Sequence, residues 1–83
     1  MNVIDLFCGC GGFSKGFEQA GFNIRLGLDV WEDAVKTYQF NFPSAATINE
    51  DISNLTGEDL LKRANISAED VDVIIGGPPC QGF

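Results

Sequence analysis

The stretch that decides the fold is Val3-Ile4-Asp5-Leu6-Phe7-Cys8-Gly9-Cys10-Gly11-Gly12-Phe13, near the amino terminus. It begins as a mostly apolar run and then has three glycines within four positions. Glycine is favoured where the backbone takes a positive φ, or where a ligand must approach the main chain closely. A helical pattern follows, and the first turn of a helix presents unpaired N–H groups and a positive dipole end. The stretch therefore predicts a strand, a tight turn and a helix, with a ligand held at the turn.

Apolar runs and helical patterns alternate along the remaining sequence. Four strands are predicted, at residues 2–7, 23–28, 46–48 and 71–75. Strands that alternate with helices favour an open parallel sheet of the α/β class, built here from about four strands and three helices. In such sheets ligands bind beyond the carboxyl ends of the strands. The glycine turn, Asp29 and Cys80 all follow predicted strands, so we expect them at that edge.

Each predicted helix has an apolar side or a recognisable end. The first ends at Gly21, a typical C-cap residue, and its apolar face is predicted to be Phe13, Gly16, Phe17 and Ala20. The second is predicted to place Trp31, Ala34, Val35 and Tyr38 on one side. The third is predicted to begin at the N-cap Thr56, with Asp59 at the capping-box position, and to end near Asn65.

Composition limits the classes of protein that fit. The chain has 83 residues and 45% hydrophobic residues, which suits one small folded domain rather than a disordered chain. No apolar run approaches transmembrane length and no signal-like segment is present, so a cytoplasmic protein is expected. Three cysteines, two of them flanking Gly9, make a poor disulfide framework and suit a reducing compartment.

The net charge of −7 argues against this chain alone holding a phosphate backbone, which requires a basic surface. Any nucleic-acid function must therefore take its positive surface from another region.

The glycine turn could serve several kinds of ligand. A dehydrogenase needs the pattern G-x-G-x-x-G, and Ser14 stands where its third glycine should be. A nucleoside ligand still fits, because Asp29 ends the second strand, where a carboxylate can accept hydrogen bonds from ribose hydroxyls. Asp29 can equally cap the following helix, and Asp51 is consistent with ordinary turn chemistry.

The three cysteines have different expected roles. Cys8 and Cys10 lack the further ligands that zinc needs, since the chain has no histidine, so no metal is expected and both are interpreted as small buried side chains. Cys80 lies just past a strand end, and Pro78 and Pro79 stiffen the approach to it. A catalytic thiol must be held still and partly open, which this position allows. A structural cysteine in a rigid turn is the alternative.

Two stretches together resemble the cytosine carbon-5 DNA methyltransferases. The run from Asp5 to Phe13 is similar to that family's first motif, and Gly77-Pro78-Pro79-Cys80-Gln81-Gly82-Phe83 is similar to its catalytic motif. The resemblance covers the whole chain and implies the Rossmann-like fold of S-adenosylmethionine-dependent methyltransferases. It further implies that Cys80 is the nucleophile. The residues that would bind S-adenosylmethionine are Phe7, Gly9, Cys10, Gly11, Gly12, Asp29, Val30, Asp51 and Ile52.

The family's later motifs and its target-recognition region have no counterpart here. We therefore expect residues 1–83 to be the amino-terminal part of a single methyltransferase catalytic domain, inactive by itself. DNA would be bound through the missing regions, commonly in a restriction–modification setting, and the location would be nuclear in a eukaryote. A tRNA cytosine-5 methyltransferase of the same family and a non-catalytic S-adenosylmethionine-binding module are the alternatives.

The resemblance also implies the strand order 3-2-1-4, which leaves one edge of the fourth strand bare. Bare strand edges invite pairing with another chain. We therefore expect the protein to self-associate or to need a complementing carboxy-terminal chain.

Overall fold

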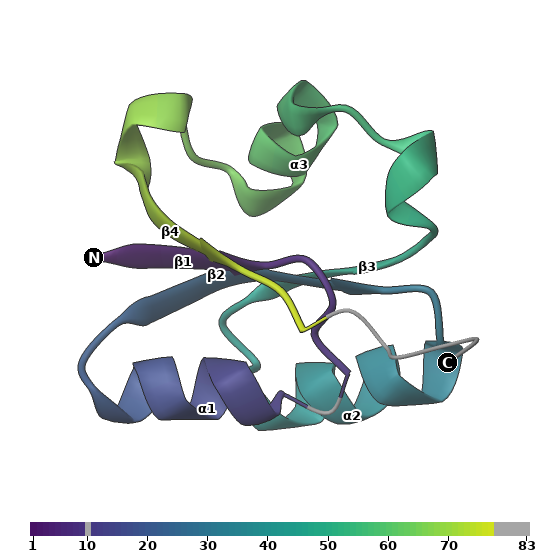
Figure 1. Ribbon diagram of the computed structural model, residues 1–83, viewed down its shortest axis with the longest axis horizontal. Helices are drawn as coiled ribbons and strands as arrows, with labels where there is room; N and C mark the ends of the chain where they lie inside the picture. The colour runs from purple at the N-terminus through teal and green to yellow at the C-terminus, as the bar shows by residue number, and fades with distance from the viewer. Residues whose placement is uncertain (10, 78–83) are drawn as a thin grey trace.

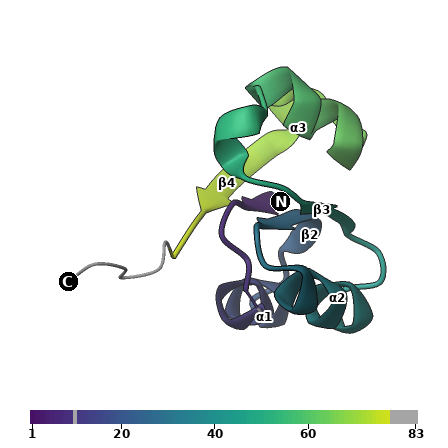
Figure 2. The same ribbon diagram turned by 90° about the vertical axis from the view of Figure 1, so that its right-hand side faces the viewer.

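The computed structural model describes residues 1–9 and 11–77. Within these ranges four parallel strands form one sheet in the order β3-β2-β1-β4. The helices α1 and α2 cover one face of this sheet and α3 covers the other (Figures 1 and 2). The predicted α/β sheet of four strands and three helices is therefore confirmed, as is the strand order. The strands are β1 (Asn2–Asp5), β2 (Asn23–Asp29), β3 (Ala46–Asn49) and β4 (Val71–Ile75), and the helices are α1 (Gly12–Gln19), α2 (Glu32–Asn41) and α3 (Gly57–Ala64).

The register of the sheet brings the strand ends to one edge. Asp5, the last residue of β1, pairs with Gly27 of β2 and with Ile75, the last residue of β4. Asp29 and Asn49 are partners at the last pair of the β2–β3 ladder. The residues that follow all four strands therefore leave the sheet at the same edge. At the side of the sheet, β4 has only β1 as a neighbour among the strands of the described ranges.

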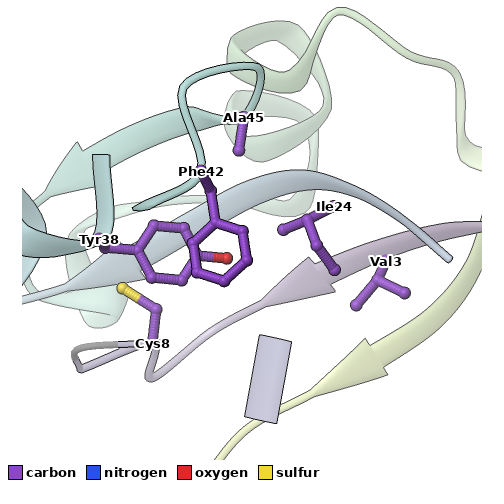
Figure 3. Close-up of a cluster of buried hydrophobic side chains, with 6 residues drawn as sticks. All are labelled: Val3, Cys8, Ile24, Tyr38, Phe42 and Ala45. Carbon is purple, nitrogen blue, oxygen red and sulfur yellow. The ribbon is translucent and has the colours of Figure 1, made fainter. Parts of the chain in front are cut away.

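Two apolar clusters lie on opposite faces of the sheet. The first packs under α1 and α2 and is drawn in Figure 3, where the Cys8 side chain points toward the ring of Tyr38. Cys8 is 5% exposed, so its predicted burial is confirmed. The first cluster is Val3, Cys8, Ile24, Tyr38, Phe42 and Ala45, and the second, under α3, is Ile4, Leu26, Leu28, Ile48 and Ala64.

The predicted apolar face of the first helix is wrong in detail. The buried residue of α1 is Ser14, whereas Phe13 is 59% exposed. Phe17 packs against the first cluster as expected, but Gly16 and Ala20 are exposed. The reason is that the inward side of the first turn meets the polar groups Asp5 and Tyr38 rather than apolar side chains.

A similar correction applies at the start of the second helix. Ala34, Val35 and Tyr38 are buried as predicted, but Trp31 is 66% exposed. Trp31 is the N-cap residue with an extended backbone, so its side chain does not follow the helical face.

The third helix has both predicted ends. The Thr56 hydroxyl accepts a hydrogen bond from the Asp59 N–H at 3.1 Å, and the Thr56 N–H donates to the Asp59 carboxylate at 2.9 Å. This reciprocal pair is the capping box. At the other end Asn65 takes a left-handed conformation with φ of 57°, which closes the helix.

Candidate cofactor-binding site

The glycine turn leaves the end of β1 and crosses toward β2. Gly9 and Gly11 have φ of +51° and +101°, the left-handed region in which glycine is favoured. The Cys8 N–H donates to the Leu28 carbonyl at 2.9 Å, and the Gly11 N–H donates to the Cys8 carbonyl at 2.8 Å. The predicted tight turn between strand and helix is therefore present, and it stays attached to β2 beyond the last ladder pair.

The three glycines of the turn differ in what surrounds them. A Cβ on Gly11 would overlap the ring of Phe42 and press on Tyr38, so packing explains this glycine. A Cβ on Gly9 or Gly12 would meet no atom within 4 Å. Gly12 also lacks a positive φ, so neither strain nor packing among the described residues requires a glycine there. The open space over its backbone fits a ligand that approaches the start of α1 closely.

Asp29 connects the end of β2 to this turn. Its Oδ2 accepts a hydrogen bond from the Gly9 N–H at 2.9 Å, and its Oδ1 accepts one from the Trp31 N–H at 3.0 Å. An ionised carboxylate offers about four acceptor positions, so these two bonds leave capacity for hydroxyl donors. The expected helix-cap role of Asp29 is wrong, because the N-cap residue of α2 is Trp31 and no side chain caps this helix. The carboxylate instead holds the connection between β2 and α2, and it keeps acceptor capacity for a ligand.

Asn49 is a residue of this site that the sequence analysis did not single out. Its side-chain amide donates to the Asp29 carbonyl at 3.2 Å and to the Val30 carbonyl at 3.0 Å. Val30 is 69% exposed, so an apolar surface lies open directly after the carboxylate. The only sequence signal for Asn49 was its place at the end of a short strand, which was too general to point to a role.

Asp51 and Ile52 follow β3 and lie at the start of a short 3-10 segment, Ile52–Asn54. The Asp51 carboxylate accepts hydrogen bonds from the N–H and the hydroxyl of Ser53, and these bonds lower the pKa of Asp51. Ile52 packs on the α3-side cluster. Both residues thus lie at the expected edge, but no described contact joins them to the glycine turn.

A buried polar chain lies beneath the turn. The Ser14 hydroxyl donates to the Asp5 carboxylate at 2.8 Å and is 2.7 Å from the Tyr38 hydroxyl. Ser14 has one proton to give, so with Ser14 donating to Asp5 the Tyr38 hydroxyl donates to Ser14. All three residues are at most 1% exposed. Burial raises the pKa of Asp5, while the bond from Ser14 acts in the opposite direction; burial also raises the pKa of Tyr38.

The hydrogen bonds of Ser14 explain why a serine, and not the third glycine of a dinucleotide motif, stands at position 14. Ser14 joins β1 to α2 through α1, and so fixes the helix that begins at the turn. Sequence reasoning found the missing glycine but not the partners of the serine, because Asp5 and Tyr38 are distant in sequence and meet only in the fold.

Gly76 and Gly77, which follow β4, lie beside two aromatic residues that flank the glycine turn. A Cβ on Gly76 would lie 3.2 Å from the ring of Phe7, and one on Gly77 would lie 2.6 Å from the ring of Phe13. Phe7, Gly9, Gly11, Gly12, Asp29 and Val30 are thus brought to one edge by the described residues. Cys10 and Cys80, also predicted for this site, lie outside the described residues.

Comparison with known proteins agrees with these motifs. A family model described as C-5 cytosine-specific DNA methylase matches residues 1–83. The chain belongs to this family. The type II methyltransferase M.DdeI of Desulfomicrobium norvegicum is 56% identical over 85 residues, and M.XorII of Xanthomonas oryzae is 46% identical over 80 residues. The matches cover 100% and 96% of this chain but 19% of each relative, so the chain spans about a fifth of their length.

Solved structures extend this methylase assignment to the fold. A prophage-encoded protein from E. coli, assigned as a DNA modification methyltransferase, superposes with a TM-score of 0.88 at 42% identity. A triple-substitution variant of Spodoptera frugiperda DNMT2 superposes with a TM-score of 0.76 at 31% identity. They are matched over 100% and 99% of this chain, and over 24% of each of their own chains. The fold is therefore that of the S-adenosylmethionine-dependent methyltransferases, as the resemblance implied.

Among residues 1–9 and 11–77, no group of three or more His, Cys, Asp or Glu side chains could hold a metal ion. In the same ranges no helix is long and apolar enough to cross a bilayer.

Proposed function

We propose that this chain is the amino-terminal, cofactor-binding part of a DNA (cytosine-5-)-methyltransferase. The enzyme would transfer a methyl group from S-adenosylmethionine to carbon 5 of cytosine in DNA. The observation that carries the proposal is the hydrogen bond between Asp29 and Gly9, because it joins two of the motif segments into one continuous edge. Membership of the C-5 cytosine-specific methylase family supports the reaction class.

The cofactor would lie across the carboxyl ends of β1, β2 and β3. The exposed start of α1, at Gly12, would face the methionine end, where the helix dipole favours a carboxylate, and the buried Gly11 would shape the turn beneath it. Asp29 would accept hydrogen bonds from the ribose hydroxyls, and the exposed side chain of Val30 would pack on adenine. Phe7, Gly9 and Cys10 would complete the cradle, with Asp51 and Ile52 at the adenine edge. When bound, S-adenosylmethionine supplies an electrophilic methyl group.

Cys80 would provide the nucleophile. Its thiolate would add to carbon 6 of the cytosine, which makes carbon 5 electron-rich enough to take the methyl group. Removal of the proton from carbon 5 would then expel the thiolate and restore the ring. Because the target base must leave the helical stack for this attack, the enzyme would flip it out of the duplex. The positions of Gly76 beside Phe7 and of Gly77 beside Phe13 support the proposal, because they bring the end of the described chain next to residues that flank the glycine turn.

The activity can be tested with a hybrid enzyme. This chain would replace the matching 85 residues of M.DdeI, the relative with 56% identity. The assay uses DNA containing 5-fluorocytosine, in which fluorine blocks the final proton loss and traps the covalent adduct. We expect the hybrid to form the adduct and the Cys80→Ser hybrid to form none. S-adenosylhomocysteine binding by both hybrids is the control for folding.

Three outcomes would contradict the proposal. An adduct formed by the Cys80→Ser hybrid would assign the nucleophile to another residue. A folded hybrid that binds cofactor but methylates tRNA rather than DNA would favour the tRNA-directed alternative, and one that does neither would favour a non-catalytic binding module.

Positive surface for DNA would come from a complementing region, since the net charge of this chain is −7. We propose that this region docks beside β4, with self-association as the competing outcome. Ile74 on this edge strand is 63% exposed, and a hollow of about 210 Å³ lies next to it. Its lining is almost wholly apolar: Ile4, Leu6, Gly57, Leu60, Leu61, Ala68, Val71 and Ile74.

Light scattering of the chain with and without the carboxy-terminal remainder of M.DdeI tests this docking. A one-to-one complex that Ile74→Asp weakens is the expected result. A dimer of the chain alone, equally sensitive to Ile74→Asp, would favour self-association. We further propose that the protein works in the cytoplasm, where its cysteines would stay reduced.

A further inference from the structure

We infer that Asn49 is a positioning residue for the nucleotide half of the cofactor site. It would act through the peptide between Asp29 and Val30 rather than by chemistry of its own. This inference rests on the proposed function, because fixing that peptide affects ligand binding only where a nucleotide binds beside it.

The geometry places Asn49 at the last pair of the sheet. It is the register partner of Asp29, and beyond this pair β2 turns away into α2. A strand that turns away leaves its last carbonyls without a ladder partner, and such groups need another donor. The Asn49 amide carries two N–H donors, and it reaches both carbonyls, of Asp29 at 3.2 Å and of Val30 at 3.0 Å. One side chain therefore holds two consecutive carbonyls at the point where the chain leaves β2.

The orientation of the peptide between Asp29 and Val30 controls two groups that face the proposed cofactor. The carboxylate of Asp29 receives the Gly9 N–H at 2.9 Å, and the neighbouring Val30 side chain is 69% exposed. Rotation of the peptide between them would withdraw the carboxylate from Gly9 and tilt the apolar surface away. A line of hydrogen bonds thus runs from Asn49 of β3 through Asp29 of β2 to the turn after β1.

The competing interpretation is that Asn49 only closes a strand end, without any effect on ligand binding. The chain offers a matched control for this. At the opposite end of the sheet, the Asn2 side-chain amide donates to the Asp70 carbonyl at 2.9 Å. Both asparagines are on strands and bond to backbone carbonyls of another segment, but only Asn49 lies at the cofactor edge.

The test compares Asn49→Ala with Asn2→Ala in the hybrid in which this chain replaces the matching part of M.DdeI. Calorimetry measures binding of S-adenosylhomocysteine and of adenosine, and amide hydrogen exchange measures protection of the Gly9 N–H. We expect Asn49→Ala to weaken both ligands about fivefold, the size of one lost hydrogen bond, and to speed exchange at Gly9. Asn2→Ala should leave ligand affinity and Gly9 exchange unchanged. Asn49→Asp, which keeps the shape but removes the donors, should behave as Asn49→Ala does.

The outcomes separate this inference from the proposed function. Ligand binding by the unaltered chain that Asn49→Ala and Asn49→Asp leave unchanged overturns the role of Asn49 alone. Equal losses in Asn49→Ala and Asn2→Ala also overturn it, since they would reflect general destabilisation. If the hybrid with the unaltered chain binds neither ligand, the cofactor proposal fails, and the positioning role fails with it.

Discussion

The buried chain Asp5–Ser14–Tyr38 gives a sharp prediction for Ser14→Ala. The substitution removes two hydrogen bonds, one to a carboxylate and one from a phenol, where all three side chains are at most 1% exposed. A bond to a charged group contributes about 1.5–3 kcal/mol and a neutral one about 0.5–1.5 kcal/mol. Since the two hydrogen bonds share one hydroxyl, their contributions do not add fully, and we expect the free energy of unfolding to fall by about 3 kcal/mol. That decrease is a large part of the total free energy of unfolding, which is roughly 4–12 kcal/mol for a domain of this size.

The assay is urea unfolding, supported by thermal unfolding. At about 4–8 °C per kcal/mol for so small a domain, Tm should fall by about 12–24 °C. Tyr38→Phe should cost less, and the double variant should cost less than the sum of the two, because each single change leaves the other partner unsatisfied. Ser53→Ala is the matched control: it breaks a serine–aspartate bond on the exposed surface and should change Tm little.

The effect of Ser14→Ala should also depend on pH. Burial raises the pKa of Asp5 above its ordinary value of 3.8, so the folded state holds this proton more tightly than the unfolded state does. The stabilisation from the protonated Asp5 carboxyl is complete below pH 3.8, and it is lost as the pH rises through the pKa of Asp5 in the folded state. Loss of the Ser14 donor raises that pKa further, so the cost of Ser14→Ala should grow from acidic to neutral pH. A cost below about 1 kcal/mol near neutral pH, or one independent of pH, would refute the reasoning.

Three further changes test other parts of the fold. Gly27→Ala should destabilise by about 1–3 kcal/mol in urea unfolding, because its Cβ would overlap the ring of Tyr38; an unchanged midpoint would contradict this packing. Thr56→Ala should lower Tm by a few degrees through loss of the capping box, with a smaller effect at acidic pH, since the bonds from Thr56 lower the pKa of Asp59 and protonation weakens them. Asp29→Ala should reduce the free energy of S-adenosylhomocysteine binding, measured by calorimetry, more than it reduces the free energy of unfolding. Equal reductions in the two free energies would indicate only a structural role.

The elements with strong local signals could be predicted from the sequence. The strand β4 was predicted at its observed bounds, Val71–Ile75, because a β-branched run between an acidic segment and two glycines is distinctive. The start of α3 followed from the capping-box pattern of Thr56 and Asp59. The positive φ of Gly9 and Gly11 followed from the density of glycines in the turn.

Features that depend on distant partners could not be predicted in this way. Periodicity placed Phe13 on the buried face of the first helix, but the groups beneath that face are polar and bury Ser14 instead. Trp31 followed the helical pattern in sequence but precedes the helix in the structure. The role of Asn49 depends on its pairing with Asp29, twenty residues earlier, which no local pattern encodes.

The central position of β1 has a consequence for synthesis on the ribosome. One of its edges is filled early, by β2, but the other must wait for β4, whose Asp72 accepts the Asn2 N–H across 70 residues of sequence. At about 5–20 residues per second, that edge would stay open for roughly 4–14 s in each nascent chain. During this interval the apolar strand is accessible to chaperones and to neighbouring chains, and the speed of elongation sets the length of the exposure.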